Sequence, residues 1–209
     1  LWKYDINTNE WTWMQGNPWT TMWNPVQPNY GTYQTPSPTN TPGNRWETSA
    51  SWTDANGNLW LFGGEGHDST IWPIPAYYND MWKYDVGLNQ WVWMNGPNHP
   101  NDSGYYGIKG VASPSNRPPS RSTYAKWKDQ SGNFYLFAGT GGVFSGGGYN
   151  DVWKYDVSLN NWIWMSGDST VMSNGSYSAE CVTLPSNIPR SDFENRSTCF
   201  DPLDNAYIF

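Results

Sequence analysis

Charge is scarce in this sequence, and cysteine and histidine are nearly absent. Only 14% of the 209 residues are charged, the formal net charge is −7, and there are two cysteines and two histidines. An acidic chain without a Lys/Arg cluster repels a phosphate backbone, so nucleic acid is a poor candidate as a partner. No apolar run approaches the roughly 20 residues of a membrane-spanning helix.

Aromatic and turn-forming residues dominate instead. Aromatics make up 18% of the chain, with 16 Trp, 21 Gly and 16 Pro. Helices favour Ala, Leu, Glu, Lys and Arg, whereas aromatic residues favour strands and Gly, Pro and Asn favour the turns between them. The composition predicts an all-β fold, and its aromatic content argues against disorder.

The two cysteines, Cys181 and Cys199, leave several arrangements open. The loop between them is short, and a disulfide there would stabilise the fold by about 3 kcal/mol through loop entropy. Otherwise they are unlinked thiols of a reducing compartment, or one of them is buried as a small apolar residue.

Internal repetition is the strongest feature of the chain. The segment LWKYDINTNEWTWMQG at 1–16 returns as MWKYDVGLNQWVWMNG at 81–96 and as VWKYDVSLNNWIWMSG at 152–167. A second block begins at Arg45, Arg121 and Arg196. The interval from Met14 to Arg45 equals that from Met165 to Arg196, which favours Arg196 over Arg190 as the third copy.

Each repeat contains four short strand candidates. Their side chains alternate as a strand requires, with Trp82, Tyr84 and Val86 on one face. Asp85 and Asn89 bracket a tight turn between the third and fourth strands. An antiparallel meander of this kind cannot bury both faces alone, so the copies must stack. The expected strands are, in order of their place in the repeat, 49–53 and 123–128; 59–62, 134–137 and 206–209; 81–86 and 152–157; 91–94 and 162–165.

These residues resemble the kelch repeat, in which a hydrophobic run and a double glycine precede a Tyr, six residues and a Trp. Leu59–Phe62 precedes Gly63 and Gly64, and the spacing of Tyr84 to Trp91 recurs at Tyr155–Trp162 and Tyr4–Trp11. The second copy departs from the pattern with Ala138-Gly139. The resemblance implies a kelch-type β-propeller with four-stranded antiparallel blades, of the long-repeat, often secreted bacterial subgroup.

We therefore expect 1–209 to be one incomplete β-propeller, with about three blades present. The repeat units are 1–80, 81–151 and 152–209, with blade boundaries near Arg45, Arg121 and Arg196. Because the sequence is cut in mid-repeat at both ends, missing blades or further copies of the chain are expected to complete it.

Residues that recur at the same position of each repeat are expected to pack within or between blades. They are Trp2, Trp82 and Trp153; Trp11, Trp91 and Trp162; Trp13, Trp93 and Trp164; Trp52 and Trp127; Trp60; Tyr84 and Tyr155; and Gly63 and Gly64. The repeated arginines are expected to donate to backbone carbonyls or to pair with a carboxylate of a neighbouring blade, Asp80 or Asp151.

Ligand contacts are expected from residues that do not repeat. Trp19, Trp23, Trp46 and Trp72 could stack on sugar rings or anchor a protein partner, or fold loops back onto the blades. The loop after the double glycine carries Glu65, His67 and Asp68, which offer an acid, a base and a metal ligand. The alternative for these three is a solvated loop without chemistry.

No catalytic motif emerges from the sequence. Kelch propellers include galactose oxidase, whose copper site needs two Tyr, two His and a Cys joined to one Tyr, whereas His67 and His99 lie here in unrelated contexts. Neither a phosphate-binding loop nor a nucleophile elbow is present. We expect no enzyme activity, no catalytic residue, no metal and no cofactor.

The expected function is a non-catalytic, secreted or cell-surface binding module that displays long loops on a rigid scaffold. Its ligand would be a glycan or a cell-surface protein. One alternative is a structural subunit of a surface layer or fibre, because open blade edges can pair with further strands. Another is a fragment of a galactose-oxidase-like copper enzyme whose site lies in missing blades.

Overall fold

The computed structural model is built from short antiparallel strands. It describes residues 1–19, 26–47, 51–69, 71, 74–141, 147–194 and 197–208, so Trp23, Trp72 and Arg196 lie outside the described residues. Within these ranges every regular element is a strand, and none is a helix that could cross a membrane. The all-β class expected from the composition is confirmed.

Two sheets contain a run of four paired strands each. The first full sheet comprises β4 (Ser51–Thr53), β5 (Leu59–Gly66), β6 (Ala76–Asp85) and β7 (Gln90–Asn95), with β3 (Arg45–Trp46) beside the end of β5. The second full sheet comprises β8 (Ala125–Lys128), β9 (Phe134–Phe137), β12 (Val152–Asp156) and β13 (Asn161–Ser166). Both are antiparallel meanders, because each strand pairs with the next strand of its own sheet.

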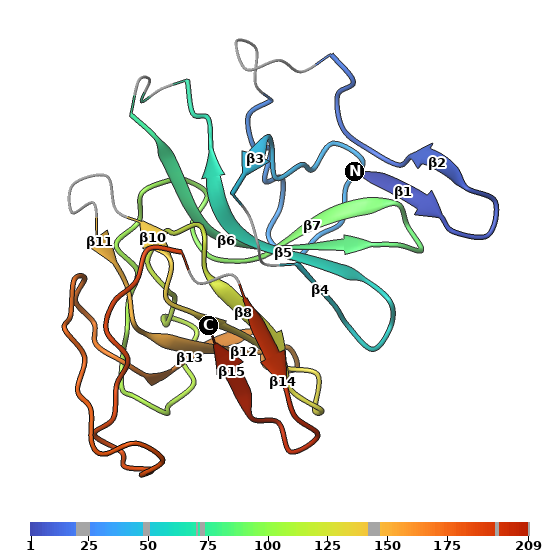
Figure 1. The fold of residues 1–209 in the computed structure, drawn as a ribbon. Helices are drawn as coiled ribbons and strands as arrows, with labels where there is room; N and C mark the ends of the chain where they lie inside the picture. The colour runs from blue at the N-terminus through green and yellow to red at the C-terminus, as the bar shows by residue number, and fades with distance from the viewer. Residues whose placement is uncertain are drawn as a thin grey trace.

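Two hairpins flank the full sheets. The N-terminal hairpin, β1 (Trp2–Asp5) and β2 (Glu10–Trp13), projects at one end of the molecule, and the C-terminal hairpin, β14 (Thr198–Phe200) and β15 (Ala206–Ile208), lies beside β8 (Figure 1). Thr198 Oγ1 donates to the Lys126 carbonyl of β8 over 3.1 Å. Two short strands, β10 (Thr140–Gly141) and β11 (Gly147–Gly148), pair with each other and form a separate two-stranded sheet.

Strands lie at the positions that the repeat predicts, although β5 and β6 are longer and β8 begins at Ala125 instead of Thr123. β5 continues through the double glycine to Gly66, and β6 begins at Ala76 instead of Met81. Gly63 and Gly64 have φ values of 52° and 96°, and the β5–β6 register shifts between Phe62 and Gly64. Glycine adopts these angles without steric cost, so the ladder passes a bulge and resumes. Glu65, expected in a loop, therefore belongs to a strand.

The turns between third and fourth strands follow the expected chemistry. Asp85 Oδ1 accepts from the Leu88 N–H over 2.9 Å, and Asn89 has a φ of 56°. Asn9 and Asn160 take the same left-handed conformation. Asn tolerates this region better than other side chains do, which is why the same residue closes all three hairpins.

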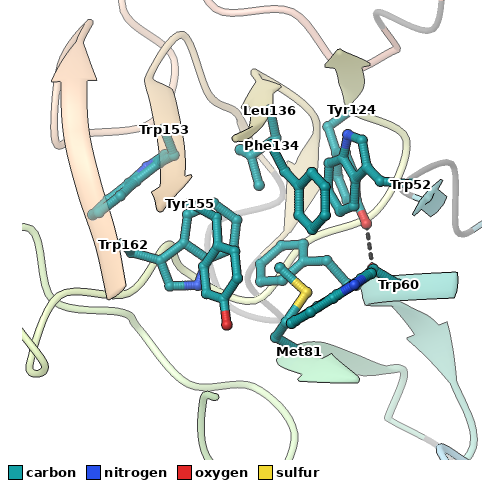
Figure 2. Close-up of a cluster of buried hydrophobic side chains, with 10 residues drawn as sticks. Trp52, Trp60, Met81, Tyr124, Phe134, Leu136, Trp153, Tyr155 and Trp162 are labelled. Atoms are coloured by element: carbon teal, nitrogen blue, oxygen red, sulfur yellow. Dashed lines mark hydrogen bonds between the residues drawn. The ribbon is translucent and has the colours of Figure 1, made fainter. Parts of the chain in front are cut away.

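Aromatic side chains fill the junction between the two full sheets (Figure 2). Phe62 lies 5.0 Å from Trp162 between ring centroids, and Trp52 stacks on Phe134 at 4.9 Å. Trp52 Nε1 also donates to the Trp127 carbonyl over 2.8 Å. Each large aromatic buries 150–250 Å² or so. The sheets are therefore joined mainly through side chains.

The tryptophans of the N-terminal hairpin are exposed, unlike their counterparts in the full sheets. Trp2, Trp11 and Trp13 are 60%, 66% and 48% exposed, whereas Trp82 and Trp153 are fully buried. In the full sheets Tyr30 covers Trp82 at 5.1 Å, and Tyr106 covers Trp153 at 5.0 Å. The WKYD residues form a strand in all three copies, but their tryptophan is buried only where a tyrosine from another segment covers it.

A buried ion pair recurs beside each full sheet. Arg45 donates to both Asp80 carboxylate oxygens, over 2.8 and 2.6 Å, and to the Gly63 carbonyl over 3.0 Å. Arg121 makes the same contacts with Asp151 and with the Ala138 carbonyl. Both kinds of expected partner, a backbone carbonyl and a carboxylate, are therefore present. Arg45 lies in β3 of the same sheet as Asp80, and Arg121 and Asp151 lie shortly before β8 and β12 of the second full sheet. The expectation of a neighbouring blade was therefore wrong.

Each of these aspartates also accepts hydrogen bonds from two aromatic side chains. Asp151 Oδ2 accepts from Trp153 Nε1 and from the Tyr106 hydroxyl, each over 2.7 Å. Asp80 accepts in the same way from Trp82 Nε1 and the Tyr30 hydroxyl. Burial, followed by the negative charge of Asp151, raises the pKa of Tyr106 far above its usual range. The phenol therefore stays a donor.

The cysteines are free and exposed. Both Cys181 and Cys199 are unlinked thiols at the surface. Neither the disulfide nor the buried apolar cysteine considered from the sequence is present, which leaves the unlinked pair.

Replacing Arg121 by Met should lower the free energy of unfolding by about 3–5 kcal/mol, because it leaves Asp151 as an uncompensated buried charge. The control is Arg117→Met. Arg117 pairs with Asp102 over 2.8 Å but keeps 32% of its side chain exposed, so about 1 kcal/mol or less is expected. Urea unfolding at neutral pH measures both variants. Equal losses would contradict a special role for the buried pair.

Candidate functional site

The extended ends of β5 and β6 bring polar and aromatic residues together. Trp46 of β3 is the register partner of Glu65 in β5, and Glu65 is the partner of Tyr77 in β6. Residues directly opposite each other in antiparallel strands share a face, with Cβ atoms about 5 Å apart. Trp46, Glu65 and Tyr77 therefore form a row across three strands.

His67 completes this group, here named the loop-end cluster: Trp46, Glu65, His67 and Tyr77. The imidazole and indole centroids lie 5.7 Å apart, with the rings tilted by 58°. Trp46 is 40% exposed, and the other three side chains are half-buried. The cluster thus presents an accessible indole beside a carboxylate, an imidazole and a phenol.

The backbone beneath the cluster is held by Tyr78, which lies one residue on from Tyr77. The Tyr78 hydroxyl donates to the His67 carbonyl over 3.3 Å, and the Arg45 guanidinium lies 3.6 Å above the Tyr78 ring. Burial, opposed by Arg45 and assisted by the negative charge of Asp68, raises the pKa of Tyr78 to about 12. The charge of Asp68 therefore influences Tyr78, the buried residue that supports the cluster.

The Tyr77 phenol is neutral at physiological pH. Burial, and then the negative charge of Glu65, raise the pKa of Tyr77 above its usual value of 10.0. Its hydroxyl can donate or accept, whereas the Glu65 carboxylate only accepts. The cluster can therefore satisfy several neighbouring hydroxyl groups of a ligand at once.

The structure brings together three of the residues singled out in the sequence: Trp46, Glu65 and His67. None of the contacts above involves Trp19, which is 82% exposed in the segment after β2 and whose backbone N–H donates to the Asn17 side-chain oxygen over 2.9 Å. Tyr77 was missed, because the sequence before Met81 was interpreted as a loop. Its signal was the alternation of Ala76, Tyr78 and Asp80 with Tyr77 and Asn79.

Metal ligands do not gather in the described part of the chain. No group of three or more His, Cys, Asp and Glu side chains there is placed to hold an ion. His67 and Glu65 alone fall short of the three or four protein ligands that a zinc site needs.

Comparison with known proteins gives no family. No protein-family model matches the chain, and no protein with a curated description matches it. Among solved structures, one titled "Structure of YjhT" is similar at 17% sequence identity and a TM-score of 0.43. The match covers 60% of this chain and 38% of that chain. At this level the likeness supports no inference about fold or function.

Replacing Glu65 by Gln should lower the pKa of Tyr77, because a neighbouring negative charge disfavours the phenolate. The measurement is NMR titration of ring-labelled tyrosine, with the Tyr77 signal assigned through Tyr77→Phe. Asp68→Asn is the matched control, since its charge acts on Tyr78. A Tyr77 signal that moves with Asp68 but not with Glu65 would refute the described row.

Proposed function

We propose that this chain is part of a kelch-type β-propeller that binds a glycan outside the cytoplasm, without catalysis. The repeat in the sequence supports the propeller, as do two four-stranded meanders that contain matching aromatic contacts, with Trp82 against Trp91 in one and Trp153 against Trp162 in the other. A rigid scaffold of this kind carries function on the segments at the ends of its strands.

One observation carries the choice of ligand: the row of Trp46, Glu65 and Tyr77, with the indole accessible. A pyranose ring has an apolar face of C–H groups and an edge of hydroxyls. An exposed indole can cover the apolar face, as aromatic anchors do in binding sites. Glu65 and the neutral Tyr77 phenol, lying beside it, would accept and donate hydrogen bonds at the hydroxyl edge.

The number of carboxyl groups in the loop-end cluster favours binding over hydrolysis in this proposal. Glycoside hydrolysis uses two carboxyl groups that flank the scissile bond. The described cluster has Glu65 on its face, while Asp68 interacts with Tyr78 beneath. We therefore assign Glu65 to hydroxyl recognition, and we expect no turnover of bound glycans.

Trp46→Ala should weaken glycan binding at least tenfold, which corresponds to about 1.4 kcal/mol, because the stacking surface is lost. Glu65→Gln should also weaken binding, since one charged acceptor is lost. A glycan array identifies the sugar, and titration calorimetry measures both variants against it.

Trp19→Ala is the matched control, because its indole is more exposed than that of Trp46 and lies outside the cluster. Its affinity should stay within twofold of the unmodified chain. Equal losses for both tryptophan variants would overturn the assignment of the site. An array without any bound sugar, together with capture of a surface protein that requires Trp46, would replace the glycan with a protein ligand.

A further inference from the structure

Acidic side chains dominate the segment that builds the loop-end cluster. Between Arg45 and Lys83 the sequence has no Lys or Arg. Glu65 lies in the cluster itself, and Asp68 follows just beyond the end of β5. Lys83 lies six positions along β6 from Tyr77, which is about 20 Å at the rise of an extended strand. The nearest lysine of this segment is therefore too distant to neutralise the cluster.

The arginine that begins this segment, Arg45, is already neutralised. It donates to both carboxylate oxygens of Asp80 and to the Gly63 carbonyl, and its side chain is only 3% exposed. Arg121, in the segment that leads into the second full sheet, pairs with Asp151 and is fully buried. Neither guanidinium is therefore available to a carboxylate at the surface.

The Glu65 carboxylate has no partner within the part of the chain that the structure describes. It is half-buried, and there it accepts no hydrogen bond and joins no ion pair. The neighbouring Tyr77 is a neutral phenol and offers no positive charge. A partly desolvated carboxylate gains more from a charged donor than from a neutral one. The site therefore favours a ligand that supplies a cation.

We propose that the glycan bound at the loop-end cluster is an amino sugar, a pyranose whose 2-amino group is free and positively charged. This inference rests on the glycan function proposed above and names the class of sugar. With the pyranose face on the Trp46 indole, an equatorial amine lies at the edge of the ring, beside Glu65. The ammonium takes the place of one hydroxyl at that edge and donates a charge-assisted hydrogen bond to the carboxylate.

The indole adds to the preference for a cation. The face of an indole attracts an ammonium that lies within about 6 Å of the ring centroid. Trp46 and Glu65 are register partners, with Cβ atoms about 5 Å apart, so one ammonium can lie near both. A uronic acid or a sulfated sugar would instead place its negative charge beside Glu65 and Asp68. The cluster therefore discriminates against acidic glycans.

Asn101 holds Tyr77 in place beside the carboxylate. The Asn101 side-chain oxygen accepts from the Tyr77 N–H over 3.0 Å, and the Asn101 N–H donates to the Tyr77 carbonyl over 2.6 Å. On its other side Tyr77 pairs with Glu65 of β5. An ammonium has three N–H donors, so the fixed Tyr77 oxygen can accept a second one while Glu65 accepts the first.

The test compares three β-1,4-linked tetrasaccharides, of glucosamine, N-acetylglucosamine and glucose, by titration calorimetry in one buffer that keeps the glucosamine amine protonated. The glucosamine tetramer should bind about fivefold more tightly than either of the others, because hydrogen bonds to charged groups are stronger than neutral ones. Added salt should weaken the binding of the glucosamine tetramer and leave that of the glucose tetramer unchanged, since salt screens only the charged contact.

Glu65→Gln should remove the preference and bring the glucosamine and glucose tetramers within about twofold of each other, because a neutral amide replaces the charged acceptor. Retained binding of the glucose tetramer shows that this variant is folded. Glu180→Gln is the matched control, since its exposed side chain lies outside the cluster and its loss changes the net charge equally. Equal losses for both variants would show a general attraction to an acidic chain and would overturn the inference.

Failure of the amino-sugar assignment can be distinguished from failure of the glycan function. Equal binding of all three tetrasaccharides that requires Trp46 would overturn the amino sugar and keep the glycan. Absence of any bound sugar would overturn both. If a lysine-containing peptide then bound in a manner that required both Trp46 and Glu65, the cation would belong to a protein ligand.

Discussion

A buried guanidinium–carboxylate pair joins each full sheet to the loop that precedes it. Burying two charges is costly, and the cost is offset only when every remaining hydrogen-bonding group is satisfied. Here the carboxylate of Asp151 accepts from Arg121, Trp153 and Tyr106, which come from three separate segments. The site therefore fixes the position of the loop, the third strand and the start of the first strand together. The same constraint at Asp80 explains why Arg, Asp, Trp and Tyr recur as a group.

The bulge at Gly63 and Gly64 links this structural unit to the candidate site. Because the ladder resumes after the bulge, β5 and β6 extend past the ion pair and bring Glu65 beside Trp46 and Tyr77. A side chain at Gly63 would place its Cβ 2.7 Å from the Tyr78 carbonyl. The glycines thus serve two purposes, since they let the strand continue and let Tyr78 support the backbone at His67. The stability of the scaffold and the geometry of the loop-end cluster depend on the same few residues.

Much of the fold could be predicted from the sequence, because the repeat marks strands and turns directly. The extension of β5 could not, since a double glycine usually ends a strand and only the pairing with β6 keeps this one going. The exposure of Trp2 and Trp13 could not either, because burial depends on a tyrosine supplied by another segment and not on WKYD itself. The Arg–Asp partners were named correctly but assigned to neighbouring blades, since distance along the chain does not reveal which residues share a sheet. Of the candidate site, Trp46, Glu65 and His67 were found and Tyr77 was not.

The long loops cover the sheet that follows them, and this has a consequence for how such a chain can be recombined. Tyr30 reaches forward to Trp82, and Tyr106 reaches forward to Trp153. A crossover at Arg45 or Arg121 would separate each tyrosine from its tryptophan, whereas a crossover just after a fourth strand, near Asn17 or Asn95, would keep them together. The unit that can be duplicated or exchanged is therefore a loop plus its following sheet, and gene fusions cut at that boundary should preserve the tyrosine–tryptophan and Arg–Asp contacts within the unit.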